Sequence, residues 1–362
     1  MNFPSFPSVI HQCILEKCAP RDVFFLSLLS KNMKNTIKRT RFDTSLPPEL
    51  FWTVKAKRIQ LTVTVNSQKL LLEFYYPPKK QHFLCGMNFR NGGLFIRCRE
   101  FTDPSDNTPK IWCLDVESRG GSVLLVFRVL QYCLNIFRFP KTIDLHVNPN
   151  LKSDFNTFLQ MCPIRNLRKL RVIANSMIQP KLEDVLNRFQ ISHCLCLGVQ
   201  RKGQLAESSE LFQLDHLLIY QSHWMTRNHL LNFSGKHGHF QNSSLTVEDC
   251  IEFVKKWKNS DDNKLESLIV VLDRLNHNVL DVGKIHEELE LMEYNPERRA
   301  SHYFYGAMFF SDIRFNETAG SRSRNFTRGW DMERNDGLLS SIVIGPKLFF
   351  FVVWHNRFPV TS

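Results

Sequence analysis

Apolar residues recur at a regular spacing through the middle of the chain. Each occurrence has an apolar residue or proline, followed three and five positions later by two more apolar residues. The first positions are residues 111, 140, 167, 191, 214 and 265, so the successive steps are 29, 27, 24, 23 and 51. Between these occurrences, apolar positions at helical spacing predict amphipathic helices. The predicted helices are 123–137, 151–161, 177–189 and 245–258.

Strand-helix units of this length predict an α/β fold. A period in the twenties is the period of leucine-rich repeats, in which stacked units share one continuous core. We therefore predict a degenerate leucine-rich-repeat-like strand-helix solenoid over residues 105–275. The exposed sheet face of a solenoid is by default a protein-binding surface. An ordinary α/β domain is the alternative.

The first 45 residues have a different pattern, with three short helical segments separated by turn signals. Ser8 can cap a helix that runs to about Cys18, and Pro20 or Asp22 can start a second helix. Ser30 can cap a third. Three such helices bury little apolar surface by themselves. We therefore expect this module to need a partner that completes its core.

Three short motifs in this module resemble the F-box. They are Phe6-Pro7, Pro20-Arg21-Asp22-Val23 and Leu26-Ser27-Leu28-Leu29-Ser30-Lys31. The resemblance implies a helical module whose opening pair and apolar side dock on a Skp-type adaptor. The residues that it implies as adaptor contacts are Phe6, Pro7, Ile10, Ile14, Pro20, Val23 and Leu26. A plain helical hairpin is the alternative interpretation of the same residues.

Two later regions resemble the type-2 F-box-associated domain, which occurs with F-boxes in a family expanded in nematodes. One runs from Leu245 to Leu268, and the other comprises Trp330–Gly337 and the apolar segment Phe349–Trp354. The resemblance implies a non-catalytic substrate receptor of a Skp-cullin-F-box ubiquitin ligase. Such a receptor binds the adaptor through the F-box and a cullin through that adaptor, and it holds a protein target near the ubiquitin-transfer site.

The C-terminal residues predict a small β cap on the repeats. Asp336-Gly337 is a two-residue hairpin turn between strands at 330–334 and 338–344, and 349–354 is a buried strand. Residues 316–328 predict a loop. The domain organisation is then an F-box module, a linker with a first strand-rich unit, the repeat or F-box-associated domain, and a C-terminal helix with the β cap. Their ranges are 1–45, 46–104, 105–275 and 276–362.

Charge adds a competing function. The chain of 362 residues has a formal net charge of +12, and residues 1–60 hold ten Lys and Arg against four acidic residues. With Arg322, Arg324 and Arg328 in the predicted loop, a basic nucleic-acid-binding protein is an alternative. Apolar positions interrupt the basic run without aromatic stacking platforms, which favours the F-box interpretation. A protein-binding scaffold without a link to ubiquitin is the third hypothesis.

The sequence also indicates a compartment. The longest apolar run, 348–354, is far shorter than a membrane-spanning helix, and the first residues lack the basic and apolar segments of a signal peptide. We therefore expect a cytoplasmic or nuclear protein that is not membrane-bound. The ten cysteines are then expected to be reduced thiols.

Motifs with metal or catalytic potential are weak. Cys194 and Cys196 occupy core positions of a repeat, and no second pair stands at zinc-finger spacing. His237 and His239 lie in a glycine-containing segment that we predict to be a loop. Residues 286–290 have glutamate where a zinc-protease motif has its second histidine. We therefore expect no catalytic residue, no metal site and no cofactor.

Overall fold

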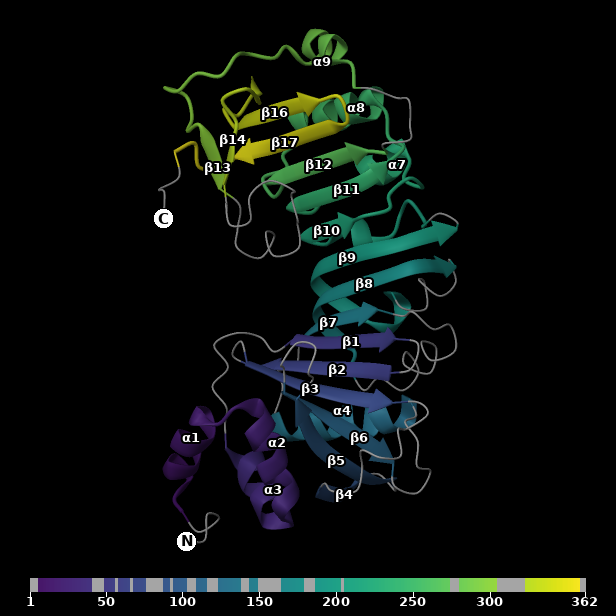
Figure 1. The fold of residues 1–362 in the computed structure, drawn as a ribbon. Coiled ribbons are helices and arrows are strands. Elements are labelled where there is room, and N and C mark those ends of the chain that lie inside the picture. Colours follow the sequence, from purple (N-terminus) through teal and green to yellow (C-terminus); the bar gives the residue numbers. More distant parts are fainter. Residues whose placement is uncertain are drawn as a thin grey trace. The chain divides into compact units, whose positions relative to one another are not determined.

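The fold was obtained as a computed structural model (Figure 1). It describes residues 6–40, 49–55, 58–65, 68–75, 87–91, 94–102, 109–115, 123–137, 143–148, 164–178, 186–202, 205–273, 280–304 and 323–358. The chain divides into two compact units. Unit 1 comprises Met1–Asn175 and Pro180–Ser192, and unit 2 comprises Ser176–Gln179 and His193–Ser362. The division falls inside the range 105–275. Each unit combines helices with paired strands, so the prediction of a mixed α/β fold is confirmed.

Unit 1 begins with three helices, as predicted. They are α1 (Ser8–Lys17), α2 (Pro20–Leu29) and α3 (Lys31–Arg39). Ser30 caps α3, because its side chain accepts a hydrogen bond from the Met33 N–H. The prediction that Ser8 caps α1 is wrong, since Pro7 is the N-cap residue and Ser8 is the first helical residue. α2 starts at Pro20, where the missing N–H of proline costs no helical hydrogen bond.

The other described elements of unit 1 are strands and one long helix. They are β1 (Glu49–Lys55), β2 (Arg58–Val65), β3 (Gln68–Tyr75), β4 (Met87–Asn91), β5 (Leu94–Thr102), β6 (Pro109–Asp115), α4 (Val123–Phe137), β7 (Ile143–Asn148) and β8 (Asn166–Ile178). Hydrogen bonding arranges the strands in the order β8-β7-β1-β2-β3-β6-β5-β4. The pairs β7–β8, β1–β7 and β3–β6 are parallel, and the other pairs are antiparallel.

Helix α4 connects the N-terminal helices to the sheet of unit 1. It is apolar around most of its circumference, which is typical of a helix buried on all sides. Its buried residues are Leu125, Val126, Phe127, Val129, Leu130, Tyr132, Cys133, Ile136 and Phe137. α4 packs against β2, β4 and β5 as well as against α2 and α3, beside which it lies in Figure 1. The core of the three short helices is thus completed, at least in part, within the chain itself.

Unit 2 contains a second set of strands and helices. The described elements are β9 (Gln190–Lys202), the 3₁₀ helix η3 (Glu210–Gln213), β10 (His216–Ile219), α7 (Arg227–Leu231), β11 (His237–Ser243), α8 (Val247–Lys258), β12 (Ser267–Leu272), α9 (Val282–Leu289), β13 (His302–Phe304), β14 (Ser323–Asn325), β15 (Trp330–Glu333), β16 (Leu339–Gly345) and β17 (Leu348–Trp354). β9, β10, β11 and β12 are parallel neighbours. β17, β16 and β15 follow β12 as antiparallel strands.

Strand β11 accounts for the longest step in the sequence pattern. The occurrences that begin at 191, 214 and 265 coincide with β9, β10 and β12, and β11 is the parallel strand between the last two. The prediction that His237 and His239 lie in a loop is therefore wrong, because both are buried residues of β11. The strand forms between two neighbours despite a sequence with little β propensity, since pairing and burial outweigh intrinsic preference.

The predicted helices agree with the structure in part. The range 123–137 coincides with α4, and 245–258 contains α8. The helix predicted over 177–189 is wrong at its start, because β8 continues to Ile178. The helix predicted over 151–161 lies outside the described residues. None of the helices in the described part of the chain is long and apolar enough to cross a membrane.

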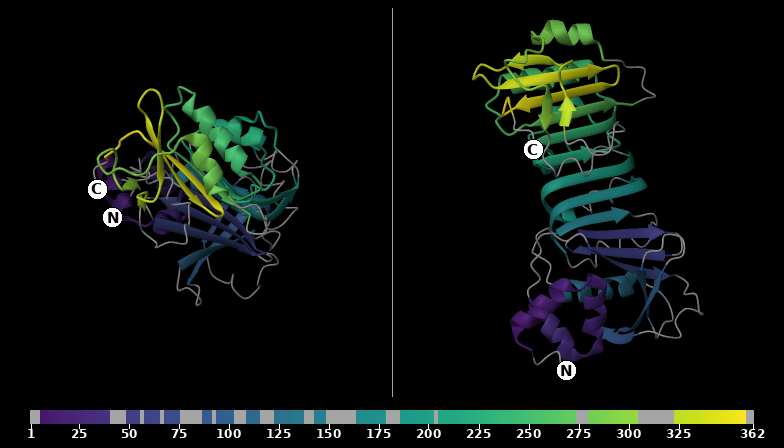
Figure 2. Two further views of the ribbon diagram at one scale, coloured as in Figure 1. Left: turned by 90° about the horizontal axis from the view of Figure 1, so that it is seen from above. Right: turned by 60° about the vertical axis from the view of Figure 1, so that its left-hand side comes forward.

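Strand β17 is buried on both faces, which explains the longest apolar run of the sequence. Phe351 contacts Trp257 of α8, and their ring centroids are 5.1 Å apart. Phe350 and Trp354 point to the other face, where both contact Phe326. The sequence of a strand covered on both faces is a continuous apolar segment rather than an alternating one. In Figure 2 (left), the green helices α8 and α9 lie on one side of the yellow strands.

The C-terminal hairpin forms as predicted. Asp336-Gly337 lies in the turn between β15 and β16, and Gly337 has a φ of 85°, which glycine adopts without a steric penalty. Through the pairing of β17 with β12, these strands continue the sheet of unit 2. Residues 323–325 form β14, so the loop predicted over 316–328 is wrong there. Residues 316–322 lie outside the described residues.

Candidate functional site

The inner side of the N-terminal helices packs against α4. Val23, Phe24 and Ile37 are almost completely buried. The Phe24 ring meets the Tyr132 ring edge-on, with centroids 5.9 Å apart. The Tyr132 hydroxyl donates a hydrogen bond of 3.1 Å to the Ser27 carbonyl oxygen. Apolar packing and a buried polar contact therefore both fix α2 on α4.

The outer side of α1 is apolar and exposed. Val9, Ile10, Cys13 and Ile14 occupy neighbouring positions on one side of the helix, because residues four apart share a face. We call these four residues the α1 outer face. Val9 is 69% exposed, Ile10 42% and Ile14 38%, and Leu29 at the end of α2 is also exposed. Exposed apolar residues that adjoin each other are typical of a protein-interaction site.

The residues implied as adaptor contacts fall into three groups. Pro7, Ile10 and Ile14 are exposed. Phe6 and Leu26 are half-buried, and Pro20 and Val23 are buried. Pro20 and Val23 support the packing of α2 from inside, so their part in a contact with another protein stays a prediction. Val9 and Leu29 were absent from the implied set. The helical spacing of Val9 to Cys13 is a signal that could have identified it.

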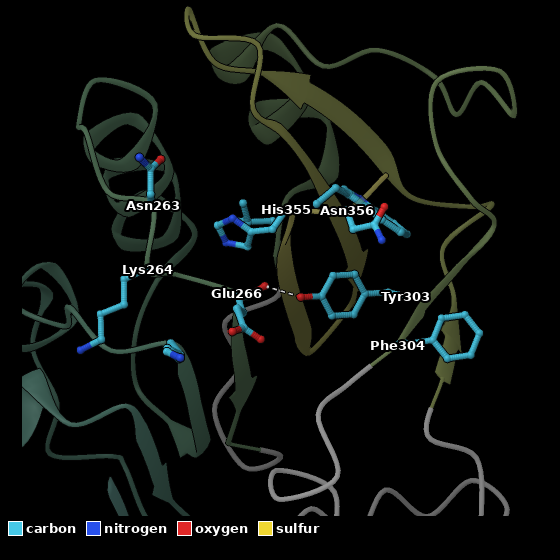
Figure 3. A pocket seen from close by; sticks show the side chains of 10 residues that line it. Asn263, Lys264, Glu266, Tyr303, Phe304, His355 and Asn356 are labelled. Carbon is cyan, nitrogen blue, oxygen red and sulfur yellow. Dashed lines mark hydrogen bonds between the residues drawn. The ribbon is translucent and has the colours of Figure 1, made fainter. Parts of the chain in front are cut away.

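A pocket of about 340 Å³ lies in unit 2, at the edge where its parallel strands begin. β10, β11 and β12 are in register, so their first residues, His216, His237 and Ser267, are neighbours. β17 runs in the opposite direction, and Trp354 therefore ends it at the same edge. The lining residues are Lys236, Asn263, Lys264, Glu266, Tyr303, Phe304, Val353, Trp354, His355 and Asn356 (Figure 3).

Backbone carbonyl groups hold two side chains of the pocket in place. The Tyr303 hydroxyl donates to the Glu266 carbonyl oxygen at 3.1 Å, as the dashed line in Figure 3 shows. His355 Nε2 lies 2.8 Å from the Leu265 carbonyl oxygen and is therefore the protonated ring nitrogen. Burial raises the pKa of Tyr303 well above its usual range, so its hydroxyl stays protonated. The aromatic wall of the pocket is thus fixed by hydrogen bonds.

Two carboxylates near the pocket are paired with basic groups. Lys264 Nζ lies 3.0 Å from Asp215 Oδ1. Burial alone would raise the pKa of Asp215, but the hydrogen bond and charge of Lys264, together with His193 and Lys236, lower that pKa. The hydrogen bond from His237 to Glu266, 3.1 Å long, is the main cause that lowers the pKa of Glu266. Both carboxylates are therefore ionised at neutral pH.

A row of histidines runs from the pocket along the beginning of the strands. The His193 and His216 rings meet edge-on at 4.3 Å between centroids, and the His216 and His237 rings stack at 5.0 Å. Burial, followed by the charges of His237 and His193, lowers the pKa of His216 to about 3. The central imidazole of the row is therefore neutral at physiological pH. The row is a packing feature of the sheet edge.

Glu266, His237 and Ser267 form a constellation that is typical of hydrolases but is buried here. His237 Nδ1 lies 2.8 Å from Ser267 Oγ, and His237 Nε2 lies 3.1 Å from Glu266 Oε2. Ser267 is completely buried as the first residue of β12, so a substrate does not reach its hydroxyl. Ser267 and His237 instead hold the Glu266 carboxylate at the wall of the pocket.

Family comparisons identify both regions. The F-box domain matches residues 3–45, and a domain described as F-box associated matches residues 210–270. The chain carries an F-box and an F-box associated domain. This confirms the family resemblance of the N-terminal module and of Leu245–Leu268, whereas the resemblance of residues 330–337 and 349–354 lies outside the matched residues and stays a prediction. The F-box contains α1, α2 and α3, whereas the F-box associated match contains β10, β11 and α8 together with the Lys236 and Glu266 sides of the pocket.

Two relatives of this F-box protein come from Caenorhabditis elegans. The uncharacterized protein F59B2.8 is 22% identical over 347 residues, which cover 93% of this chain and 74% of the relative. The uncharacterized protein F59B2.9 is 21% identical over 369 residues, covering 99% of this chain and 80% of the relative. No solved structure matches the chain. The similarity to these nematode proteins therefore extends over both units.

The other candidate motifs of the F-box protein have structural surroundings. Cys194 and Cys196 are buried in the core of unit 2, as their repeat positions predict. His286 packs edge-on against Trp330 with ring centroids 4.7 Å apart. Within the described residues, no group of His, Cys, Asp or Glu is arranged to hold a metal ion. Arg324, one arginine of the predicted basic loop, lies in β14 with its guanidinium over the Phe350 ring.

Proposed function

We propose that the protein is a substrate receptor of a Skp-cullin-F-box ubiquitin ligase, and that the α1 outer face docks on the Skp-type adaptor. The observation that carries this proposal is an exposed apolar helix face inside the region that matches the F-box. Removing apolar surface from water contributes roughly 25 cal/mol per Å² to association, so such a face favours a protein partner.

The packing of the F-box helices supports this role. Phe24 and Val23 bury the inner side, so the outer face remains as the apolar surface available for association. α4 fixes these helices independently of any partner, which limits the ordering entropy that docking would cost. The F-box would therefore present a preformed surface to the adaptor.

We assign target binding to the F-box associated unit and a non-catalytic role to the chain. A bound target would lie close to the ubiquitin-charged enzyme, which raises the effective concentration of its lysines at the thioester. We place this activity in the cytoplasm or nucleus, where the cysteines would be reduced thiols.

We further interpret the parallel strands of unit 2 as degenerate repeat units. Support comes from their spacing, because β9, β10, β11 and β12 begin at Gln190, His216, His237 and Ser267. Helices α7 and α8 connect the successive strands β10, β11 and β12. In a solenoid of this type, each unit contributes one strand to a shared core and one end of that strand to a common edge. The pocket lies on such an edge.

Co-purification with a Skp-type adaptor tests the proposed function. In the test variant, Ile10→Asp and Ile14→Asp place two charges on the α1 outer face. We expect at least a tenfold loss of recovered adaptor, because each charge would have to be desolvated in the interface. Val282→Asp is the matched control, since Val282 in α9 is 42% exposed, as is Ile10. Equal adaptor recovery by wild type and the double variant would refute the proposal.

A further inference from the structure

The Lys236 ammonium in the pocket of unit 2 lies near two carboxylates, Asp215 and Glu266, whose pKa its charge helps to lower, but each of them is paired with another basic group. Among the described residues, the Lys236 ammonium has neither an ion pair nor a hydrogen bond, although Lys264 is paired with Asp215 and Glu266 with His237. The backbone of Lys236 is nevertheless fixed. Its N–H donates to the Asp215 carbonyl oxygen at 2.8 Å, and its carbonyl accepts from the Glu266 N–H at 2.8 Å. A rigid position therefore presents an unpaired ammonium.

Two amide side chains add hydrogen-bond donors to the same pocket. The Asn263 side-chain oxygen accepts a hydrogen bond of 2.6 Å from the Arg334 guanidinium. The Asn356 side-chain oxygen accepts one of 3.2 Å from the Phe358 N–H. In both residues the oxygen is thus occupied, and the NH₂ group is the remaining polar end. Together with Lys236, these groups match the acceptor oxygens of a carboxylate.

One wall of the pocket is mainly apolar, whereas Lys264, Glu266 and His355 are the remaining polar lining residues. Tyr303, Phe304, Val353 and Trp354 form the apolar wall, and the Trp354 ring nitrogen is already engaged, donating 2.7 Å to Ser341 Oγ. In Figure 3, Tyr303 and Phe304 lie on the side opposite Lys264. A ligand that fits this pocket therefore needs an anionic group beside an apolar one. A volume of about 340 Å³ is at the small end of ligand sites and suits a short segment.

We propose that this pocket binds an acidic side chain and an adjacent apolar side chain of a partner protein. The inference deepens the proposed function, on which it rests for the role of that partner as the ligase target. The net charge of +12 favours approach of an acidic segment. A nucleic acid is disfavoured, because a phosphate backbone is read by several basic side chains along a groove. Here the lining described above holds two lysines, Lys236 and Lys264, and Lys264 is already paired with Asp215.

Selection from a phage library of short random peptides tests the inference on the full chain. We expect wild type to enrich peptides in which Asp or Glu adjoins an aromatic or aliphatic residue. Lys236→Gln should lose this enrichment, since it removes the charge and keeps the backbone contacts. Lys258→Gln is the matched control, because it removes the same charge at the end of α8, away from the pocket lining. Circular dichroism of the three proteins confirms that all are folded.

Anisotropy titrations with a fluorescein-labelled copy of the most enriched peptide measure how much the substitution weakens peptide binding. Lys236→Gln should weaken binding about tenfold, as expected for the loss of one charge-assisted hydrogen bond. Changing the acidic residue of the peptide to its amide should weaken binding by a similar factor, and combining both changes should add little. Absence of enrichment, enriched peptides without an acidic residue, or equal binding by Lys236→Gln would each overturn the inference.

Two further measurements separate the alternatives. A single-stranded DNA oligonucleotide that displaces the peptide from wild type but not from Lys236→Gln would identify a nucleic-acid site and overturn the inference. Adaptor recovery is measured on the same Lys236→Gln protein, and we expect it to equal wild type. If peptides bind as expected but no adaptor is recovered by wild type, the proposed function fails and the pocket assignment stands. Adaptor recovery without peptide binding overturns the pocket assignment and leaves the proposed function standing.

Discussion

The α1 outer face and the pocket of unit 2 are built in opposite ways. The face lies on one helix of ten residues, and its members are adjacent because of helical periodicity alone. The pairing of β11, β12 and β17 brings together Lys236, the lining residues before β12 and residues 353–356 of the pocket. Tyr303 of β13 joins them through its hydrogen bond to the Glu266 carbonyl oxygen. The face is apolar and exposed, whereas the pocket combines an aromatic wall with charged groups.

This difference suits two kinds of partner. A surface on one helix depends only on the residues of that helix, which fits the proposed docking on an adaptor. The pocket is lined mainly by residues at or beyond strand ends, where substitutions leave the sheet pairing intact and alter what is bound. One chain can thus hold an apolar helix face and a separate mixed polar and aromatic pocket. Either region can be perturbed by substitution while the other serves as the reference.

Removing the buried Arg299 guanidinium should have the largest effect. Arg299 is completely buried, pairs with Asp331 at 2.8 Å and donates to the Phe326 carbonyl oxygen at 3.0 Å. Arg299→Met leaves the Asp331 carboxylate buried without its counter-charge, which should destabilise unit 2 by about 3–5 kcal/mol. Urea unfolding followed by tryptophan fluorescence measures the loss, and adaptor recovery should persist wherever the protein stays folded.

The double variant Arg299→Met with Asp331→Asn provides the control for this prediction. Because it removes both charges, it should recover a substantial part of the lost stability. A loss below about 1 kcal/mol for Arg299→Met alone would contradict the prediction, since it would equal a surface substitution.

The second largest effect is expected on acidification, which should lower the stability that His216 contributes in unit 2. The pKa of His216 is about 3 in the folded protein and near 6.5 in the unfolded chain, so the unfolded chain binds the proton between these values. Stability from this residue is therefore complete above pH 6.5 and falls as the pH drops toward 3. Between pH 7 and pH 5 the loss should be about 2 kcal/mol.

His216→Phe keeps a ring between His193 and His237 but does not titrate. Unfolding free energies measured at pH 7 and pH 5 should therefore differ less in this variant than in wild type. His223→Phe is the matched control, since the His223 side chain is exposed, and it should keep the pH dependence of wild type. If His216→Phe keeps it as well, the histidine row does not limit acid stability.

The sequence predicted local features well and assembled ones poorly. α4 and the hairpin at Gly337 each depend on neighbours along the chain. β11 was missed because His237 and His239 are buried by pairing with strands that lie outside their own segment. The pocket was missed for the same reason, since Lys236 and Asn356 are not related by any spacing in the sequence. The α1 outer face was found in part through the F-box motifs.

Removing the hydroxyl of Tyr132 should cause a smaller loss of stability, confined to the F-box side. It lies 3.1 Å from Ser27 Oγ and donates to the Ser27 carbonyl oxygen, and the Tyr132 ring also contacts Phe24. Tyr132→Phe keeps the ring and removes the hydrogen bond, which should cost about 1–2 kcal/mol. Hydrogen exchange followed by mass spectrometry should show faster exchange in α2 than in wild type, with α8 unchanged. Equal acceleration in both helices would contradict a local role.

The N-caps of α3 and α8 offer the most direct comparison of the two regions, with the smallest expected loss of stability. Thr246 accepts a hydrogen bond from the Asp249 N–H, and the Asp249 carboxylate accepts one of 2.9 Å from the Thr246 N–H, so α8 has a reciprocal capping box. Ser30 accepts from the Met33 N–H at 3.1 Å, but Met33 has no group to return the bond. Each cap contributes about 1 kcal/mol by itself.

Thr246→Ala removes one half of the α8 box, whereas Ser30→Ala removes the only side-chain cap of α3. Asp249 also pairs with Arg227 at 2.7 Å, so it remains in position in the Thr246→Ala variant and still accepts from the residue 246 N–H. We therefore expect a local loss of stability of about 1 kcal/mol in α3 for Ser30→Ala and a somewhat smaller loss in α8 for Thr246→Ala. Hydrogen exchange in the first turn of each helix measures both values, with Thr246→Ser as the conservative control. A larger loss in α8 would mean that the Asp249 contact depends on the Thr246 hydroxyl, and that the box acts as one unit.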